Sequence, residues 1–233
     1  MASPVHKSAL IVGAGHGFSA SLTRLLRKEG LAVSVAARDA AKLAPLCAET
    51  GARAFSCDAQ DAAQVQRLFA EVDHVQGEPD VVVYNASART RGPFVDLVAA
   101  DVQRAMQVCA FGAFLVAQQA AVRMLPKARG AILLTGASAS VKGYAQSAPF
   151  AMGKFALRGL AQSLARELSP QGIHVAHFVI DGGIRGPGHS DDPSRPDALL
   201  EPDAIALTYL NILRQPRSAW TWEVELRPWV ERF

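Results

Sequence analysis

The sequence predicts an α/β fold in which a doubly wound parallel sheet of about seven strands carries helices on both faces. Short apolar runs alternate with amphipathic stretches along almost the whole chain of 233 residues, as in βαβ units. A glycine-rich turn follows the first apolar run. The composition, 50% hydrophobic and 19% charged, is that of a compact globular protein. We therefore expect residues 1–233 to form a single domain.

The strands are predicted from short apolar runs, of which the last alternates polar and apolar residues with a period of two. They are expected at 9–12, 32–36, 54–57, 80–84, 130–135, 174–180 and 220–226.

The helices are predicted from the amphipathic stretches that lie between the strands. Gly30 ends the first helix, the second is rich in alanine, and Pro126 follows the end of the long fourth helix. The helices are expected at 19–28, 40–49, 62–72, 96–124, 149–168 and 203–214. The interval 182–202 is rich in Gly, Pro, Asp and Ser, which predicts a flexible surface loop that covers a substrate.

Composition excludes several classes of protein. The net charge of +3, with both signs interspersed, gives no basic stripe for nucleic acid. The N-terminus lacks the apolar core of a signal peptide, and no apolar run is expected to span a membrane. The three cysteines form no CxxC pair, and His174 and His177 face opposite sides of a strand. We expect a cytoplasmic protein without a metal site, a membrane or a nucleic-acid partner.

The turn after the first strand is a candidate nucleotide site. Gly13 would form a tight turn, and Gly17 and Phe18 would bring backbone N–H groups close to a dinucleotide pyrophosphate at a helix N-terminus. Ser19 stands where a third glycine would complete the pattern. A tight strand-to-helix turn without a ligand has a similar sequence, but the position within a βαβ run favours nucleotide binding.

These motifs, together with the run from Ser147 to Lys154, resemble the short-chain dehydrogenase/reductase family. The turn is similar to its Gly-x-x-x-Gly-x-Gly motif, and the helix is similar to its Tyr-x-x-x-Lys helix with Phe150 in place of tyrosine. The C-terminal part resembles a bacterial subgroup of short-chain oxidoreductases that also carry Phe before the lysine. The resemblance implies a Rossmann-type NAD(P)-binding domain.

Arg38 indicates which cofactor is preferred. It follows the second strand, where an acidic residue would accept the ribose hydroxyls of NAD, and a guanidinium suits the 2′-phosphate of NADP. His16 would assist when protonated, and Asp39 is expected to cap the next helix. The alternative for Arg38 is a solvated surface cation. NADP is therefore expected, and NAD is less favoured.

The resemblance assigns further cofactor contacts by position. After the third strand, Asp58 and Ala59 would bind adenine, and after the fourth, Asn85 and Ala86 would support the nucleotide. After the sixth strand, Gly182 and Ile184 would contact the nicotinamide carboxamide. Lys154 would bind the nicotinamide ribose.

The catalytic set departs from the family pattern. The family serine lies 13 residues before the tyrosine, and 150 − 13 places Ala137 there, while Cys109 stands where the family has asparagine. Only Lys154 keeps its expected type. Ser138 and Tyr144 are the nearby hydroxyl groups that would replace the lost acid, and a surface role is the alternative for Tyr144. Asp181, in place of the usual proline, is either a proton-transfer group or a turn former.

Three classes of function stay open at this point. The first is an NADP(H)-dependent oxidoreductase acting on a small carbonyl or alcohol, with a proton relay from Lys154, Ser138, Tyr144 or water. The second is a nucleotide-binding module without turnover, and the third is a lyase or isomerase on the same scaffold.

The resemblance also implies a homodimer or homotetramer paired through 96–124 and 149–168. Apolar residues expected at that interface are Val108, Phe111, Phe114, Leu115, Leu157, Leu160 and Leu164.

Overall fold

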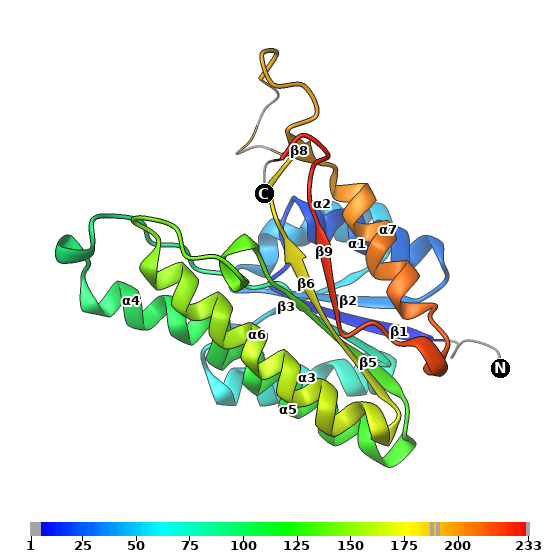
Figure 1. Ribbon diagram of the computed structural model, residues 1–233. Helices are drawn as coiled ribbons and strands as arrows, with labels where there is room; N and C mark the ends of the chain where they lie inside the picture. Colours follow the sequence, from blue (N-terminus) through cyan, green and yellow to red (C-terminus); the bar gives the residue numbers. More distant parts are fainter. Residues whose placement is uncertain (1–5, 187–188, 190–191, 232–233) are drawn as a thin grey trace.

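The computed structural model describes residues 6–186, 189 and 192–231, and its core is one sheet of seven parallel strands. The strand order is β3-β2-β1-β4-β5-β6-β9, which reverses direction next to β1 and confirms the predicted doubly wound fold (Figure 1). The strands are β1 (Ser8–Val12), β2 (Ala32–Ala37), β3 (Arg53–Ser56), β4 (Val81–Tyr84), β5 (Gly130–Thr135), β6 (Ile173–Ile180) and β9 (Glu223–Leu226).

Helices cover both faces of the sheet, because successive strand residues point to opposite sides and both sides are apolar (Figure 1). One face carries α1, α2 and α7, and the other carries α3, α4, α5 and α6. The helices are α1 (Phe18–Lys28), α2 (Ala44–Thr50), α3 (Ala62–Gln76), α4 (Ala99–Met106), α5 (Gly112–Met124), α6 (Ala148–Leu168) and α7 (Pro202–Leu213).

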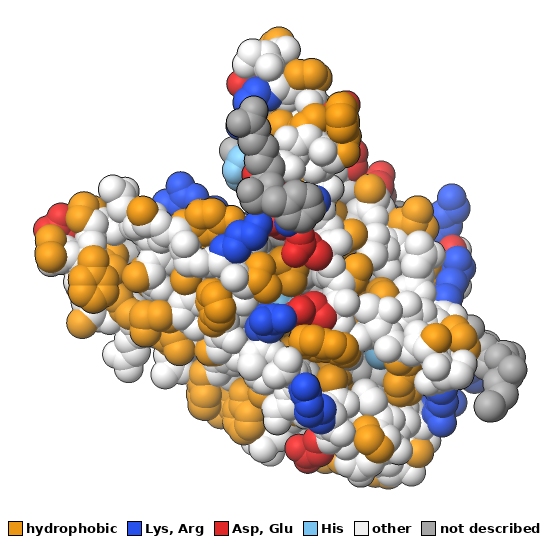
Figure 2. All heavy atoms as spheres, in the orientation of Figure 1, with side chains coloured by type: hydrophobic (Ala, Val, Ile, Leu, Met, Phe, Trp, Pro, Cys, Tyr) orange, Lys and Arg blue, Asp and Glu red, His pale blue; other side chains and the backbone are white. Residues whose placement is uncertain are grey.

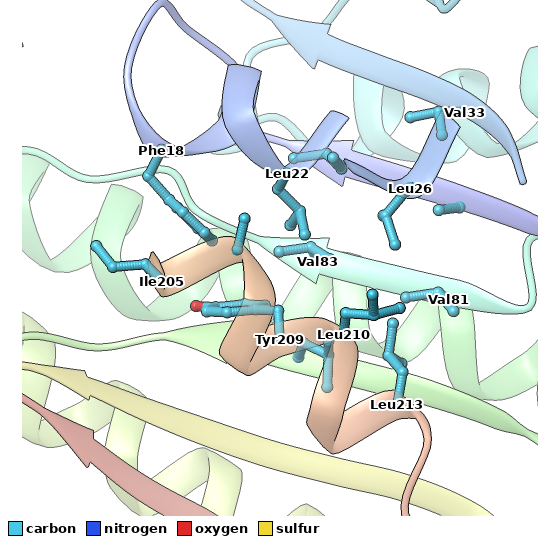
Figure 3. Packing of buried hydrophobic residues seen from close by; sticks show 14 of the residues in the cluster. Phe18, Leu22, Leu26, Val33, Val81, Val83, Ile205, Tyr209, Leu210 and Leu213 are labelled. Carbon is cyan, nitrogen blue, oxygen red and sulfur yellow. The ribbon is translucent and has the colours of Figure 1, made fainter. Parts of the chain in front are cut away.

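The core beneath α1 and α7 is continuous from the glycine turn to the end of α7. Figure 3 shows Leu22 and Leu26 of α1 and Tyr209 of α7 lying over Val81 and Val83 of β4. The Tyr209 ring stacks on Phe178 with 3.5 Å between centroids, and its hydroxyl pairs with Thr135 Oγ1 at 2.8 Å. This hydrogen bond satisfies the buried phenol, so α7 is fixed against the end of β5.

Two of the predicted helices differ from expectation. The long helix begins at Ala99 rather than at residue 96, and a π-helical turn at Gln107–Phe111 divides it into α4 and α5. The second helix begins as a 3-10 turn over Ala40–Leu43, because Pro45 lacks the N–H that a continuous helix would need. The Asp39 carboxylate accepts the N–H of Ala41 at 3.1 Å, which confirms its capping role.

The C-terminal elements are shorter than the sequence indicates. Only Glu223–Leu226 pairs with β6, and Trp220 instead stacks on His174 with centroids 4.6 Å apart. Within the predicted loop at 182–202, β7 (Gly183–Ile184) pairs with β8 (Leu199–Leu200), while residues 187, 188, 190 and 191 lie outside the described residues.

One helical stretch is both long and apolar. Among the described residues, Ala99–Lys127 is long and apolar enough to cross a membrane by length and composition. In this structure it forms α4, the π turn and α5, and α5 packs against β4, β5 and α3. Its apolar character therefore serves the core on its inner face, and its outer face remains exposed.

Candidate functional site

A groove of about 550 Å³ lies over the carboxyl ends of β1, β2, β3 and β4. This is the ligand side of doubly wound sheets. It brings together seven of the predicted cofactor residues, namely Gly13, His16, Arg38, Asp58, Ala59, Asn85 and Ala86. An adjoining cavity of about 280 Å³ is lined by Gly17, Phe18 and Ile184 among others. The linings of these two cavities do not include Lys154 or Gly182.

The glycine turn packs directly on the end of β4. Gly13 has a φ of +87°, and a Cβ there would lie 2.2 Å from the backbone nitrogen of Ala86, so only glycine fits. The Asn85 amide donates to the Gly13 carbonyl at 3.1 Å. Ser19 Oγ accepts the N–H of Gly15 at 2.8 Å. The serine that replaces the third glycine therefore stabilises the turn from within.

Arg38 directly follows β2 and lines the groove. Its side chain is exposed, and its carbonyl accepts the Ser56 hydroxyl at 2.9 Å. Asp39 caps the next turn and lies 3.5 Å from Lys42. In the part of the chain that the structure describes, no carboxylate forms an ion pair with Arg38. Its guanidinium is therefore available to a phosphate in the groove.

The three positions where the resemblance expects catalytic side chains lie in one apolar cluster. Phe150 is 7% exposed and packs with Cys109, Ala139 and Ala137. Cys109 is fully buried, and its Sγ lies 3.5 Å from the carbonyl of Ala88. The side chains at these three positions therefore contact one another and form a small apolar patch.

Lys154 is buried beside this cluster. Its side chain is 2% exposed and its Nζ donates to the Thr135 carbonyl at 2.7 Å. The ammonium also lies 5.8 Å from the centroid of the Phe150 ring. Burial lowers the pKa of this lysine below its ordinary value. Lys154 is therefore held by the end of β5 and the phenyl ring.

Ser138 and Tyr144, the predicted replacement donors, are placed differently. Ser138 opens a short 3-10 turn, Ser138–Ser140, and its carbonyl accepts the N–H of Lys142 at 2.9 Å. Tyr144 is 49% exposed in the following loop. Among the residues that the structure describes, no hydrogen bond joins either hydroxyl to the Phe150 cluster. Within the same residues, the hydrogen bond of Lys154 Nζ goes to the Thr135 carbonyl and not to either hydroxyl.

Comparison with known proteins decides the family. The sequence model of the family described as short chain dehydrogenase matches residues 7–187. This chain belongs to the short-chain dehydrogenase family. A relative, the 3-oxoacyl-[acyl-carrier-protein] reductase MabA of Mycobacterium avium, is 31% identical over 180 residues, which cover 77% of this chain and 68% of MabA.

Two solved structures of the short-chain dehydrogenase family match nearly the whole chain. A short-chain dehydrogenase from Rhodopseudomonas palustris is 33% identical with a TM-score of 0.83, covering 97% of this chain and 100% of its own. A metagenomic short-chain oxidoreductase in complex with NADP is 26% identical with a TM-score of 0.84, and the match covers 95% and 97% of the two chains. The groove described above is therefore at the cofactor side of a short-chain dehydrogenase fold.

Asp181, which this short-chain dehydrogenase has in place of proline, is engaged in ion pairs. Its carboxylate is 5% exposed and lies 2.8 Å from Lys142 Nζ and 3.0 Å from Arg227 Nη2. These two cations come from the loop after β5 and from the segment after β9. Asp181 therefore joins three chain segments at the edge of the site, and a buried carboxylate with two cationic partners has a structural role.

A second buried network lies behind Ala137 and has no signal in the sequence. His177 on β6 is fully buried, and its Nδ1 lies 3.0 Å from Glu223, which also binds Arg158 through two hydrogen bonds of 2.6 and 2.7 Å. Burial lowers the pKa of His177 to about 4, although Glu223 acts in the opposite direction. The imidazole is therefore neutral near pH 7, and a Cβ at Gly136 would lie 2.3 Å from its Nε2, so the ring leaves room only for glycine there.

Arg89 is a further site residue that sequence reasoning missed. It lies five residues beyond the end of β4 and lines the groove. Its Cζ is 4.9 Å from the centroid of the Phe150 ring. No sequence motif predicted this residue, because its contact with Phe150 joins two segments that are 61 positions apart (150 − 89). Only the fold brings this cation over the substituted tyrosine position.

Proposed function

We propose that this protein is an NADP(H)-dependent oxidoreductase that acts on a small carbonyl or alcohol substrate through an altered catalytic site. The groove carries the proposal, because it aligns the glycine turn, Arg38, Asp58 and Asn85 along one surface. The NADP complex of a 26% identical short-chain oxidoreductase supports the same cofactor class. The pairing of Asp39 with its own turn and with Lys42 supports NADP over NAD.

The residues present fit this cofactor. We assign the pyrophosphate to the glycine turn that begins at Gly13 and to the backbone N–H groups of Gly17 and Phe18 at the start of α1, where the helix dipole favours an anion. The remaining assignments follow the linings of the groove and cavity and the family pattern. Arg38 and His16 would hold the 2′-phosphate, and Asp58 and Ala59 would hold the adenine. Asn85 and Ala86 would support the central part of the nucleotide. Gly182 and Ile184 would contact the carboxamide, and Lys154 would bind the nicotinamide ribose.

The nicotinamide, when bound, would supply or accept a hydride. The chain must then move a proton to or from the substrate oxygen, and neither Phe150 nor Ala137 has one to give. We propose that Lys154, Ser138, Tyr144 or water performs this step. The lowered pKa of Lys154 brings it closer to the working range of a general acid. A positioned acid contributes about 10²–10⁴ in rate, so its loss slows turnover without abolishing it.

The apolar cluster favours a second function. Phe150, Cys109 and Ala137 occupy the place where the family stabilises a carbonyl oxygen, and their contacts are well packed. A nucleotide-binding module without turnover needs the groove and does not need a proton donor. In this second reading, Arg38 and the glycine turn keep their roles, and Lys154 serves the core.

We further propose that two or four copies assemble through the helices on the α4–α6 face. Phe111 and Phe114 are 44% and 41% exposed, with ring centroids 6.0 Å apart. Figure 2 shows hydrophobic side chains gathered on the flank where α4, α5 and α6 lie in Figure 1. Leu115 and Leu157, expected at such an interface, are instead buried in the subunit.

The segment 182–202 is proposed to cover the substrate, since Ile184 lines the smaller cavity.

Turnover of NADPH with carbonyl compounds tests the proposed function. Purified protein is mixed with NADPH and a panel of aldehydes, ketones and oxo acids, and NADPH oxidation is followed by absorbance. Oxidation that depends on one carbonyl class supports the oxidoreductase. Tight NADPH binding with no oxidation across the panel would favour the binding module. The Arg38→Asp variant is the control, because it should lose activity with NADPH through binding alone.

A further inference from the structure

Arg89 stands over the ring that replaces the catalytic tyrosine. Its guanidinium carbon is 4.9 Å from the centroid of Phe150, and the ring itself is only 7% exposed. A guanidinium held over an aromatic face is attracted by the ring and can still donate hydrogen bonds through its N–H groups. The Phe150 ring therefore helps to place a cationic hydrogen-bond donor at the end of the groove.

The donor groups of Arg89 have no acceptor within the described residues. No hydrogen bond or ion pair there involves its guanidinium, whereas Arg104, which lines the same groove, pairs with Asp101 at 3.2 Å. Desolvation, followed by the charge of Arg91, lowers the pKa of Arg89. Its positive charge is therefore not compensated locally, and an anion bound at this place would be stabilised.

The carboxylates that lie in the groove do not neutralise this cation. Asp58 binds the backbone N–H and the side-chain amide of Gln60, both at 3.1 Å. Asp39 caps its own turn beside Lys42. The groove is lined by more basic than acidic side chains, and both carboxylates already have partners. At the end near Phe150, the uncompensated positive charge is that of Arg89.

We propose that Arg89 binds the carboxylate of an oxo-acid substrate, with Phe150 as its platform. The planar fork of a guanidinium matches a carboxylate through two parallel hydrogen bonds. This inference rests on the proposed function, because it takes the Phe150 position as the place where the reacting carbonyl binds. Since Arg89 lies directly over that ring, the carboxylate and the carbonyl must be close together in the molecule. The substrate class is therefore a 2-oxo or 3-oxo acid, or the corresponding hydroxy acid.

The test compares an acid with its neutral ester on matched variants. The probes are 2-oxobutanoate and methyl 2-oxobutanoate, titrated by calorimetry at constant ionic strength into the parent protein, Arg89→Gln, Arg89→Lys and Arg166→Gln. Arg166→Gln removes the same charge at the far end of α6, where the guanidinium donates to the Gln162 carbonyl of its own helix and, among the described residues, to no other group. NADPH is titrated into each variant separately, and melting temperatures report folding.

The parent and Arg166→Gln should bind the acid at least about tenfold tighter than the ester, since one charge-assisted pair supplies about 1.4 kcal/mol or more. Arg89→Gln should reduce the preference to about twofold or less, and Arg89→Lys should retain part of it because the fork is lost. NADPH affinity should stay within about twofold of the parent value in both Arg89 variants.

Equal binding of acid and ester by the parent overturns the inference, as does an equal loss of preference in Arg89→Gln and Arg166→Gln. A tenfold loss of NADPH affinity in Arg89→Gln would also overturn it, by assigning the guanidinium to the cofactor. Failure of every variant to bind NADPH, with the acid preference intact and dependent on Arg89, would reject the proposed function while leaving the carboxylate site in place.

Discussion

The double variant Phe150→Tyr/Ala137→Ser restores two hydroxyl groups at the positions where the family keeps them. The Phe150 ring lies 5.8 Å from Lys154 Nζ and packs against Ala137, so both new oxygens would enter the same small cluster. If proton donation limits the parent protein, reduction of an activated ketone by NADPH should rise about 10²-fold or more. The rise would come from a phenol beside a cationic lysine, which lowers the pKa of the phenol.

The stability of the double variant reports where the new hydroxyls point. A hydroxyl buried without a partner costs about 1–3 kcal/mol, and in a domain of this size each kcal/mol lowers the melting temperature by about 2–4 °C. A hydroxyl that accepts from Lys154 or Arg89 should leave the melting temperature nearly unchanged. Differential scanning calorimetry and NADPH oxidation are measured on the same samples. Phe155→Tyr is the control, since that ring is 45% exposed on the same helix.

The result that refutes this reasoning is specific. If the double variant binds NADPH as tightly as the parent but reduces no ketone faster, the site does not hold a carbonyl near Phe150. The nucleotide-binding module would then be the better account of the protein. An equal gain in Phe155→Tyr would show that the added hydroxyl acts outside the proposed site.

Three further predictions follow from buried or exposed groups. Burial holds the pKa of His177 near 4, whereas the value in the unfolded chain is about 6.5. The unfolded state therefore binds the proton more readily, and the free energy of unfolding should fall by about 3 kcal/mol as the pH drops from 6.5 to 4. In urea unfolding, His177→Asn should show a weaker dependence of this free energy on pH. The protein should form a dimer or tetramer in light scattering, and Phe111→Glu with Phe114→Glu should yield monomers; a parent monomer at all concentrations would contradict the assembly. Gly13→Ala should weaken NADPH binding about tenfold or more, because its Cβ would lie 2.2 Å from backbone after β4; unchanged affinity would refute the turn assignment.

Much of the fold could be predicted from local patterns. The strands that form the sheet centre, such as Ser8–Val12 and Gly130–Thr135, are continuous apolar runs, which marks them as buried parallel strands. The groove residues could be placed because each follows directly after a strand. The capping role of Asp39 was readable from residue type alone.

Other features depend on contacts between distant segments and left no local signal. The burial of Lys154 against the Thr135 carbonyl, and the placement of Arg89 on Phe150, require the folded sheet to bring loops together. The π-helical turn at Gln107–Phe111 has no proline or glycine to mark it within the apolar run that predicted one helix. Trp220 continues the alternation of the last strand in the sequence, yet in the structure it lies outside the strand and stacks on His174, a contact between segments that are distant in the sequence.

Direct titration of NADPH and NADH into the parent protein and into Arg38→Asp tests the proposed cofactor most directly. The parent should bind NADPH at least about tenfold tighter than NADH, which corresponds to about 1.4 kcal/mol, because Arg38 has no carboxylate partner in the described part of the chain and lines the groove. Arg38→Asp should erase or reverse this preference while the melting temperature stays the same. Equal affinity of the parent for both nucleotides would contradict the assignment of NADP, and no binding of either would contradict the proposed function as a whole.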